Sequence, residues 1–171
     1  MWITPSGIPR YNLQEKDLVK VHLERGPREG NGGSGGNSNS RKLKPSIEWY
    51  MHASIYNKIS KVNAVVHTHS PFTLAIAISV NELQHIIEEA KIIVGNPIII
   101  TNSPSGSRDL AFAVSNAFKD GNDVRAVIIR NHGIVSIGSN IHQARSVIES
   151  LEEWAKILTI SNIFDGPKYV L

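Results

Sequence analysis

The sequence contains no cysteine, and it has few charged and aromatic residues. Without cysteine it can form neither a disulfide framework nor a thiolate metal site. Charged residues make up 19% of the 171 residues, aromatic residues 6% and hydrophobic residues 41%, so the chain can bury a core and is not expected to be disordered. No apolar run reaches the length of a transmembrane helix, and the N-terminus lacks the pattern of a signal peptide. We therefore expect a single cytoplasmic domain over residues 1–171.

A concentrated basic stripe is also missing. The net charge is +3, but the Lys and Arg residues are scattered along the chain and few aromatic residues lie between them. Nucleic-acid-binding proteins concentrate basic residues on one face or one helix. We therefore predict neither a nucleic-acid nor a membrane partner, while a basic balance is compatible with a phosphorylated substrate.

Helix and strand patterns alternate along the chain. Spacing near 3.6 residues predicts helices over 44–60, 107–121 and 140–164, with Ser46 as an N-cap and Gly121 as a C-terminal stop. Short apolar runs predict strands at 63–69 and 96–101, and two more within 124–138. Ser70 and Pro71 begin another helix, and residues 85–95 are ambiguous. Because strands alternate with helices, we expect helices to cover a central sheet.

The N-terminal region is less regular. Trp2 to Thr4 is predicted as a short strand without a partner, Asn12 can cap a helical turn, and Val19 to Leu23 alternates like a strand. Residues 26–42 are rich in Gly, Ser and Asn, which predicts a flexible surface loop. In the last helix, apolar spacing over 147–158 predicts core or subunit packing, and the pair Glu152-Glu153 is expected to be solvated.

Three histidines form the strongest candidate site. His67 and His69 are two residues apart at the end of a predicted strand, so they point to the same face, roughly 7 Å apart at Cα. That spacing suits two ligands of one metal ion, although two hydrogen-bonded imidazoles at a sheet edge are the alternative. His132 lies in a tight turn, where Gly133 allows a positive φ. Three imidazoles without cysteine fit a catalytic zinc site with one open position.

Glu48 is the fourth candidate residue. It lies two residues after the predicted N-cap Ser46, in the first turn of a helix, where the helix dipole favours a carboxylate. Most glutamates at such a position do no more than that. Beside a metal ion, a carboxylate can be a fourth ligand or a proton carrier.

Four separated blocks of the sequence resemble one family. They are "ITPSGIP", "KPSIEW", "NAVVHTHSPF" and "RNHGIVSIG". In this order they resemble the class II aldolase family of fuculose-phosphate aldolases and ribulose-phosphate epimerases. The resemblance implies a three-layer α/β/α domain with a mostly antiparallel central sheet, a divalent metal that is usually Zn²⁺, and a homotetramer with sites between subunits.

The resemblance also implies an activity. A ketose 1-phosphate such as fuculose 1-phosphate would be cleaved to dihydroxyacetone phosphate and an aldehyde through a zinc-stabilised enediolate. His67, His69 and His132 would bind the metal, and Glu48 would be the catalytic acid and base. The epimerase branch has a shorter acid at the position of Glu48, so glutamate favours an aldolase or a related dehydratase.

The phosphate of the substrate would be held by residues of two blocks. The resemblance assigns this role to Ser6 and Gly7 of "TPSG" and to Ser46 of "PSIE", through hydroxyl and backbone N–H donors. Three departures from the family accompany it: Ile47 replaces a second hydroxyl residue, Asn102 falls near an aromatic position, and a preceding segment with a "G-N-x-S" strand is expected to be absent. These departures leave two alternatives, a dehydratase of a related ketose phosphate and a metal-binding homologue without catalytic activity.

Overall fold

A four-stranded sheet forms the centre of the computed structural model, which describes residues 1–27, 43–118 and 123–171. The strand order is β3-β6-β5-β4. The bounds are Ala64–Thr68 for β3, Ile98–Ile100 for β4, Ala126–Ile129 for β5 and Gly133–Gly138 for β6. β6 is antiparallel to both β3 and β5, whereas β4 is parallel to β5. The prediction of a mostly antiparallel central sheet is therefore confirmed.

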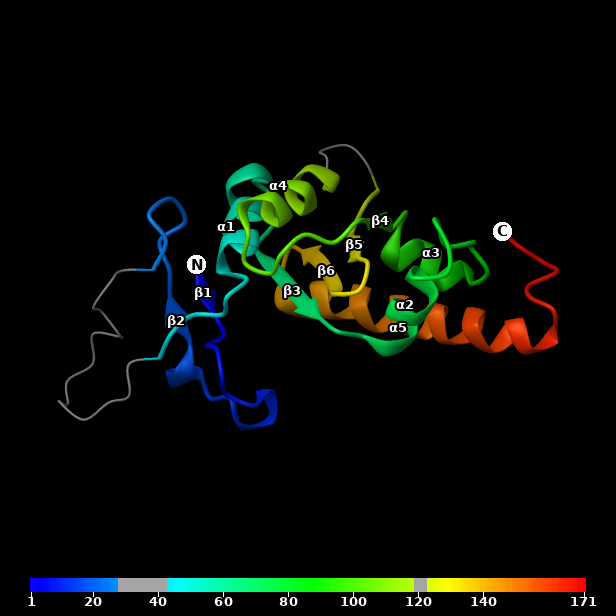
Figure 1. The fold of residues 1–171 in the computed structure, drawn as a ribbon, viewed down its shortest axis with the longest axis horizontal. Helices are drawn as coiled ribbons and strands as arrows, with labels where there is room; N and C mark the ends of the chain where they lie inside the picture. The colour runs from blue at the N-terminus through cyan, green and yellow to red at the C-terminus, as the bar shows by residue number, and fades with distance from the viewer. Residues whose placement is uncertain (28–42, 119–122) are drawn as a thin grey trace.

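Helices cover both faces of this sheet (Figure 1). α1 (Trp49–Lys58) and α4 (Arg108–Ala117) pack on one face, and α2 (Pro71–Ala77), α3 (Glu88–Val94) and α5 (Ile141–Ser161) pack on the other. Because side chains alternate along a strand, Val127 and Ile129 face α1 and α4, while Ala126 and Ile128 face α5. The fold thus has the three layers that the family resemblance implied.

Local sequence signals explain where several helices begin. The side chain of Asn140 accepts a hydrogen bond from the backbone N–H of Gln143 at 2.9 Å, at the start of α5. Ser107 caps α4 in the same way through the N–H of Leu110. The apolar stripe of α5 faces the core, and its fully or nearly fully buried members are Ala144, Val147, Ile148, Leu151, Trp154, Ala155 and Leu158. Of the two predicted roles for this stripe, core packing is the one that the structure shows.

The N-terminal residues form a small separate sheet. β1 (Trp2–Ile3) pairs antiparallel with β2 (Val19–Lys20), so the expectation that the first strand lacks a partner is wrong. The strand predicted over Val19 to Leu23 is shorter in the structure, where β2 contains only Val19 and Lys20. Between β1 and β2 lie the 3-10 helices η1 (Arg10–Asn12) and η2 (Glu15–Asp17). Asn12 ends η1, and Gln14 rather than Asn12 caps η2, because the backbone leaves helical geometry between the two turns.

The ambiguous segment 85–95 contains α3, and η3 (Asn162–Phe164) extends α5. The predicted stop at Gly121 and most of the predicted loop 26–42 lie outside the described residues.

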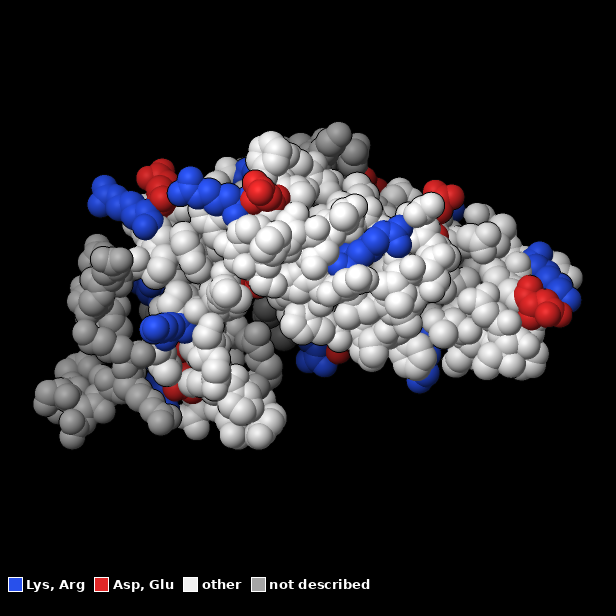
Figure 2. Space-filling model, viewed as in Figure 1, with Lys and Arg blue, Asp and Glu red and all other residues white. Residues whose placement is uncertain are grey.

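None of the described helices is both long and apolar enough to cross a lipid bilayer. On the face shown in Figure 2, described Lys and Arg residues lie in separate small groups, several of them beside Asp or Glu.

Candidate metal centre and active site

His67 and His69 lie at the end of β3, as predicted, with His69 one residue beyond the strand. Their ring centroids are 5.1 Å apart. The Nδ1 atom of His67 is 3.0 Å from the carbonyl oxygen of Ile134 on β6. Because a carbonyl can only accept a hydrogen bond, Nδ1 carries the proton and Nε2 is left free. Such a contact fixes the orientation of a metal-binding imidazole.

His132 reaches the same place from the turn between β5 and β6. Its ring centroid is 5.2 Å from that of His67 and 5.8 Å from that of His69. The positive φ in this turn belongs to Asn131, at 57°, and not to Gly133 as predicted. Asparagine adopts this conformation more readily than most residues, because its short polar side chain can bond locally.

Gly133 is required for a different reason, which is space. A Cβ atom at this position would lie 2.6 Å from the carbonyl oxygen of Thr68, 2.7 Å from Cε1 of His67 and 2.8 Å from Cδ2 of His69. Cβ atoms in proteins essentially never lie this close to other non-bonded atoms. The glycine therefore lets the β5–β6 turn approach the end of β3 closely enough for the three imidazoles to meet.

The three imidazoles form a set of nitrogen donors. One ligand atom from each of His67, His69 and His132 lies within 4.8 Å of the other two. Burial lowers the pKa of His67 to about 3, and burial also lowers the pKa of His132. Both rings are therefore neutral at pH 7, and a neutral imidazole is the form that binds metal. The buried Nδ1 of His132 has no hydrogen-bond partner among the described residues. This unpartnered atom, the three imidazole donors and the neutral form of His67 and His132 fit a site for a divalent metal ion.

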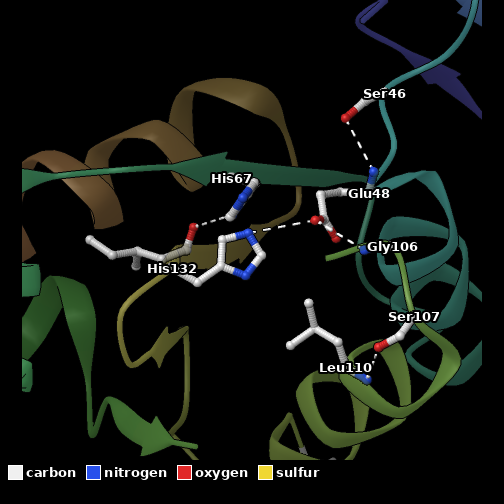
Figure 3. A network of polar contacts seen from close by, with 8 residues as sticks. Ser46, Glu48, His67, Gly106, Ser107, Leu110 and His132 are labelled. Carbon is white, nitrogen blue, oxygen red and sulfur yellow. Dashed lines mark hydrogen bonds and ion pairs between the residues drawn. The ribbon is translucent and has the colours of Figure 1, made fainter. Parts of the chain in front are cut away.

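Glu48 lies beside His132, buried to 4% exposure (Figure 3). Its Oε1 is 3.5 Å from Nε2 of His132 and accepts a hydrogen bond from the backbone N–H of Gly106 at 3.2 Å. Since His132 is neutral, the contact between Glu48 and His132 is not an ion pair. Glu48 is the N-cap residue of α1. The sequence predicted Ser46, two residues earlier, as the N-cap, but residues 47–48 form a turn before the helix begins.

The predicted phosphate-binding residues also lie close together. Thr4 to Gly7 runs beside Lys44 to Ser46: the N–H of Ser6 donates to the carbonyl of Lys44, and the N–H of Ser46 donates to the carbonyl of Thr4, both at 2.9 Å. The hydroxyl of Ser6 donates to the carbonyl of Pro45. Gly7 has a φ of 78°, and a Cβ there would meet no described atom within 4 Å, so it leaves room beside the backbone.

The hydroxyl oxygen of Ser46 links this segment to the metal centre. It accepts a hydrogen bond from the backbone N–H of Glu48 at 3.3 Å, so its own proton can be donated elsewhere. Hydrogen bonds thus connect the predicted substrate residues to Glu48 through residues 44–48, and Glu48 in turn lies beside His132.

Sequence reasoning missed two residues that hold this region. Gly106 contacts Glu48 through its backbone, a group that every residue type carries except proline. Arg130 donates to the carbonyl of Val80 and the side chain of Asn81, and also contacts the carbonyl of Ala77, tying the β5–β6 turn to the end of α2.

Glu152 was expected to be solvated, and that expectation is wrong. Its carboxylate accepts hydrogen bonds from the N–H groups of Phe72 and Thr73 and from the Thr73 hydroxyl, at 2.8 to 3.0 Å. It therefore caps α2 from a distant helix, whereas its neighbour Glu153 is exposed. The one signal for this in the sequence is that α2 begins without an acidic residue in its first turn.

Comparison with known proteins identifies the class to which this fold and site belong. The family model described as Class II Aldolase and Adducin N-terminal domain matches residues 1–159. An L-fuculose phosphate aldolase of Methanococcus maripaludis is 36% identical over 162 residues, which cover 95% of this chain and 80% of that protein. A 5-deoxy-D-ribulose 1-phosphate aldolase of Bacillus thuringiensis is 32% identical over 166 residues, covering 97% and 71%.

A solved structure gives the same fold. The l-fuculose-1-phosphate aldolase from Thermus thermophilus matches with a TM-score of 0.79 at 23% identity, over 97% of this chain and 80% of that one. The chain therefore belongs to the class II aldolase family, as the four sequence blocks predicted. Its enzyme class is that of the aldolases, which are carbon–carbon lyases.

Proposed function

We propose that this protein is a metal-dependent aldolase that cleaves a ketose 1-phosphate to dihydroxyacetone phosphate and an aldehyde. The observation that supports it most is the buried carboxylate of Glu48, 3.5 Å from one of three converging imidazoles. A purely structural metal site needs no spare carboxylate beside it. Relatives named as aldolases of fuculose phosphate and of 5-deoxyribulose 1-phosphate share the ketose phosphate class.

In this proposal His67, His69 and His132 hold the divalent ion. Zinc is the expected metal because three imidazole nitrogens without thiolate are typical of catalytic zinc sites. When bound, the ion supplies Lewis-acid polarisation of the substrate oxygens. The free Nε2 of His67 is the atom that can serve as its ligand, because Nδ1 is already bonded to Ile134.

Glu48 carries the proton. After the carbon–carbon bond breaks, the enediolate fragment needs one proton on carbon to become dihydroxyacetone phosphate. Glu48 is buried, so the proton passes between a fixed carboxyl group and the substrate rather than to bulk water. Removing this group is expected to cost about 10²- to 10⁴-fold in rate, the range typical of general acid–base catalysis.

The phosphate is assigned to Ser6, Gly7 and Ser46. The hydroxyl proton of Ser46 is available for donation, since its oxygen is the acceptor in the contact with Glu48. The hydroxyl of Ser6 must rotate away from the carbonyl of Pro45 to reach a ligand. The side chain of Ile47, 62% exposed between Ser46 and Glu48, has no hydrogen-bond donor, so the phosphate relies on fewer hydroxyl groups here.

We further propose a homotetramer, as the family resemblance implies. Large apolar side chains are exposed on several helices, including Ile92, Phe112 and Ile157. Burial in an interface would remove this apolar surface from water. Light scattering coupled to size-exclusion chromatography measures the mass directly, and a monomer at micromolar concentration would contradict the proposal.

The experiment that tests the function measures bound metal and cleavage of fuculose 1-phosphate and 5-deoxyribulose 1-phosphate. Wild type, Glu48→Gln and the exposed control His142→Ala are compared. We expect bound zinc in all three, cleavage at the wild-type rate in His142→Ala, and cleavage slower by about 10²- to 10⁴-fold in Glu48→Gln. Bound metal without cleavage of either sugar in wild type would favour the dehydratase or the non-catalytic alternative. Absence of bound metal would contradict the site.

A further inference from the structure

The two oxygens of the Glu48 carboxylate have different surroundings (Figure 3). Oε1 accepts the hydrogen bond from the N–H of Gly106 and lies 3.5 Å from Nε2 of His132. Oε2 is buried and has no hydrogen-bond partner among the described residues. A buried carboxylate oxygen without a partner costs free energy in the resting protein, so such a group calls for an explanation.

The position of Gly106 is fixed by its neighbours. Its φ is 73°, a conformation that favours glycine, and a Cβ there would lie 2.8 Å from Cγ1 and 3.0 Å from the carbonyl oxygen of Ile47. Gly106 immediately precedes Ser107, the N-cap of α4, whose side chain accepts the N–H of Leu110. The donor that contacts Glu48 is therefore held by a capped helix on one side and by Ile47 on the other.

We propose that Gly106 is a positioning residue that holds Oε1 of Glu48, so that Oε2 is the oxygen that exchanges the proton with the substrate. The inference rests on the proposed function. An oxygen that already accepts an N–H bond is less basic, so the incoming proton goes to the other oxygen. In the exchange step a C–H bond beside the carbonyl of dihydroxyacetone phosphate breaks. Its proton moves to Oε2 and the electron pair enters the enediolate. Oε2 then exchanges this proton for one from solvent, and that proton returns to carbon.

The test is exchange of that C–H hydrogen in deuterated water, followed by proton NMR with dihydroxyacetone phosphate and the zinc-loaded protein. Gly106→Ala should slow exchange about 10- to 100-fold, because the new methyl group displaces the loop from Glu48. Zinc affinity should stay within about twofold of wild type, because the three histidines keep their contacts. A merely structural defect would instead lower both.

Two further variants control for strain at a positive φ. Gly166→Ala introduces the same backbone strain far from the site, at φ 82°, with the nearest atom 3.5 Å away, and should exchange at the wild-type rate. Adding Ile47→Ala to Gly106→Ala removes the contact with Cγ1 and should restore part of the lost exchange. Gly106→Ala that is folded and exchanges at the wild-type rate would overturn the inference.

Because Gly106→Ala can fail to fold, Glu48→Asp provides a second test. The shorter side chain cannot keep both the contact with His132 and the bond from Gly106, so exchange should fall at least tenfold although an acid remains. Wild-type exchange in Glu48→Asp would overturn the inference while leaving the proposed function intact. A wild-type protein that exchanges no faster than Glu48→Gln would overturn both.

Discussion

A Cβ atom at Gly133 would lie within 2.8 Å of three atoms at the end of β3, including ring atoms of His67 and His69. Gly133→Ala is therefore expected to push the histidines apart and to weaken zinc binding at least tenfold, comparable to the loss of a group that orients metal ligands. Competition with a fluorescent chelator measures the affinity. Gly166→Ala, where the nearest described atom to a Cβ is 3.5 Å away, is the control for an added methyl group outside the site and should bind like wild type. Equal affinity in Gly133→Ala would show that the close approach is not needed.

The buried imidazoles also predict how the metal-free protein responds to acid. Burial lowers the pKa of His67 to about 3, while an unfolded chain has a histidine pKa near 6.5. Between these values the unfolded state binds the proton and the folded state does not, so stability is lost as pH falls from about 6.5 toward 3. The slope is at most about 1.4 kcal/mol per pH unit for this group.

Urea unfolding of the chelator-treated protein at pH 7, 6 and 5 measures this dependence. His67→Asn keeps a donor for the carbonyl of Ile134 but removes the titrating ring, so its slope over this range should be smaller than that of wild type. A wild-type slope unchanged by His67→Asn would contradict the lowered pKa.

The histidines could be found from the sequence because local patterns place them. His67 and His69 share a strand face, and His132 follows the apolar strand β5 at a turn. Gly106 could not be found this way, because it acts through its N–H and because the contact depends on α1 and α4 lying side by side. Gly133 was singled out for its conformation, but its role is to leave space, which requires the position of β3.

Helix α2 depends on a residue of another helix. Its N-terminal N–H groups and the fully buried Thr73 hydroxyl donate to Glu152 of α5. Glu152→Ala should lower the free energy of unfolding by about 1 to 3 kcal/mol, because a helix cap is lost and a buried donor is left unpaired. Glu153→Ala, one residue along the same helix and exposed, should change it by no more than about 0.5 kcal/mol. Denaturant titration of both variants measures the difference, and equal stabilities would contradict the cap.

Elements with regular periodicity were predictable, and those stabilised by distant contacts were not. The core stripe of α5 and the strands β5 and β6 follow from apolar spacing within one segment. The pairing of Trp2–Ile3 with Val19–Lys20 joins residues across two short 3-10 turns, and no local pattern encodes that register. In the sequence, the charge of Glu152 predicts a solvated side chain. Its hydrogen bonds to the start of α2 depend on how α2 and α5 pack, which the local sequence does not encode.

Across the protein, a metal ion would join segments that are far apart in the sequence. His67 and His69 end β3, and His132 follows β5, with α2, α3, β4 and α4 between them. An ion that binds all three stabilises only the folded chain, by about 2.7 kcal/mol when free metal exceeds the dissociation constant 100-fold. For a chain of this size that corresponds to a melting temperature higher by about 5 to 10 °C.

Differential scanning fluorimetry with chelator and with zinc measures this shift. His69→Ala removes an exposed side chain of the proposed metal site, so the metal-free variant should melt close to metal-free wild type, but zinc should raise its melting temperature far less. This pattern separates a lost ligand from a damaged fold. An equal rise with zinc in wild type and His69→Ala would mean that the metal binds elsewhere, and it would remove the physical basis for assigning the proton transfer to Glu48.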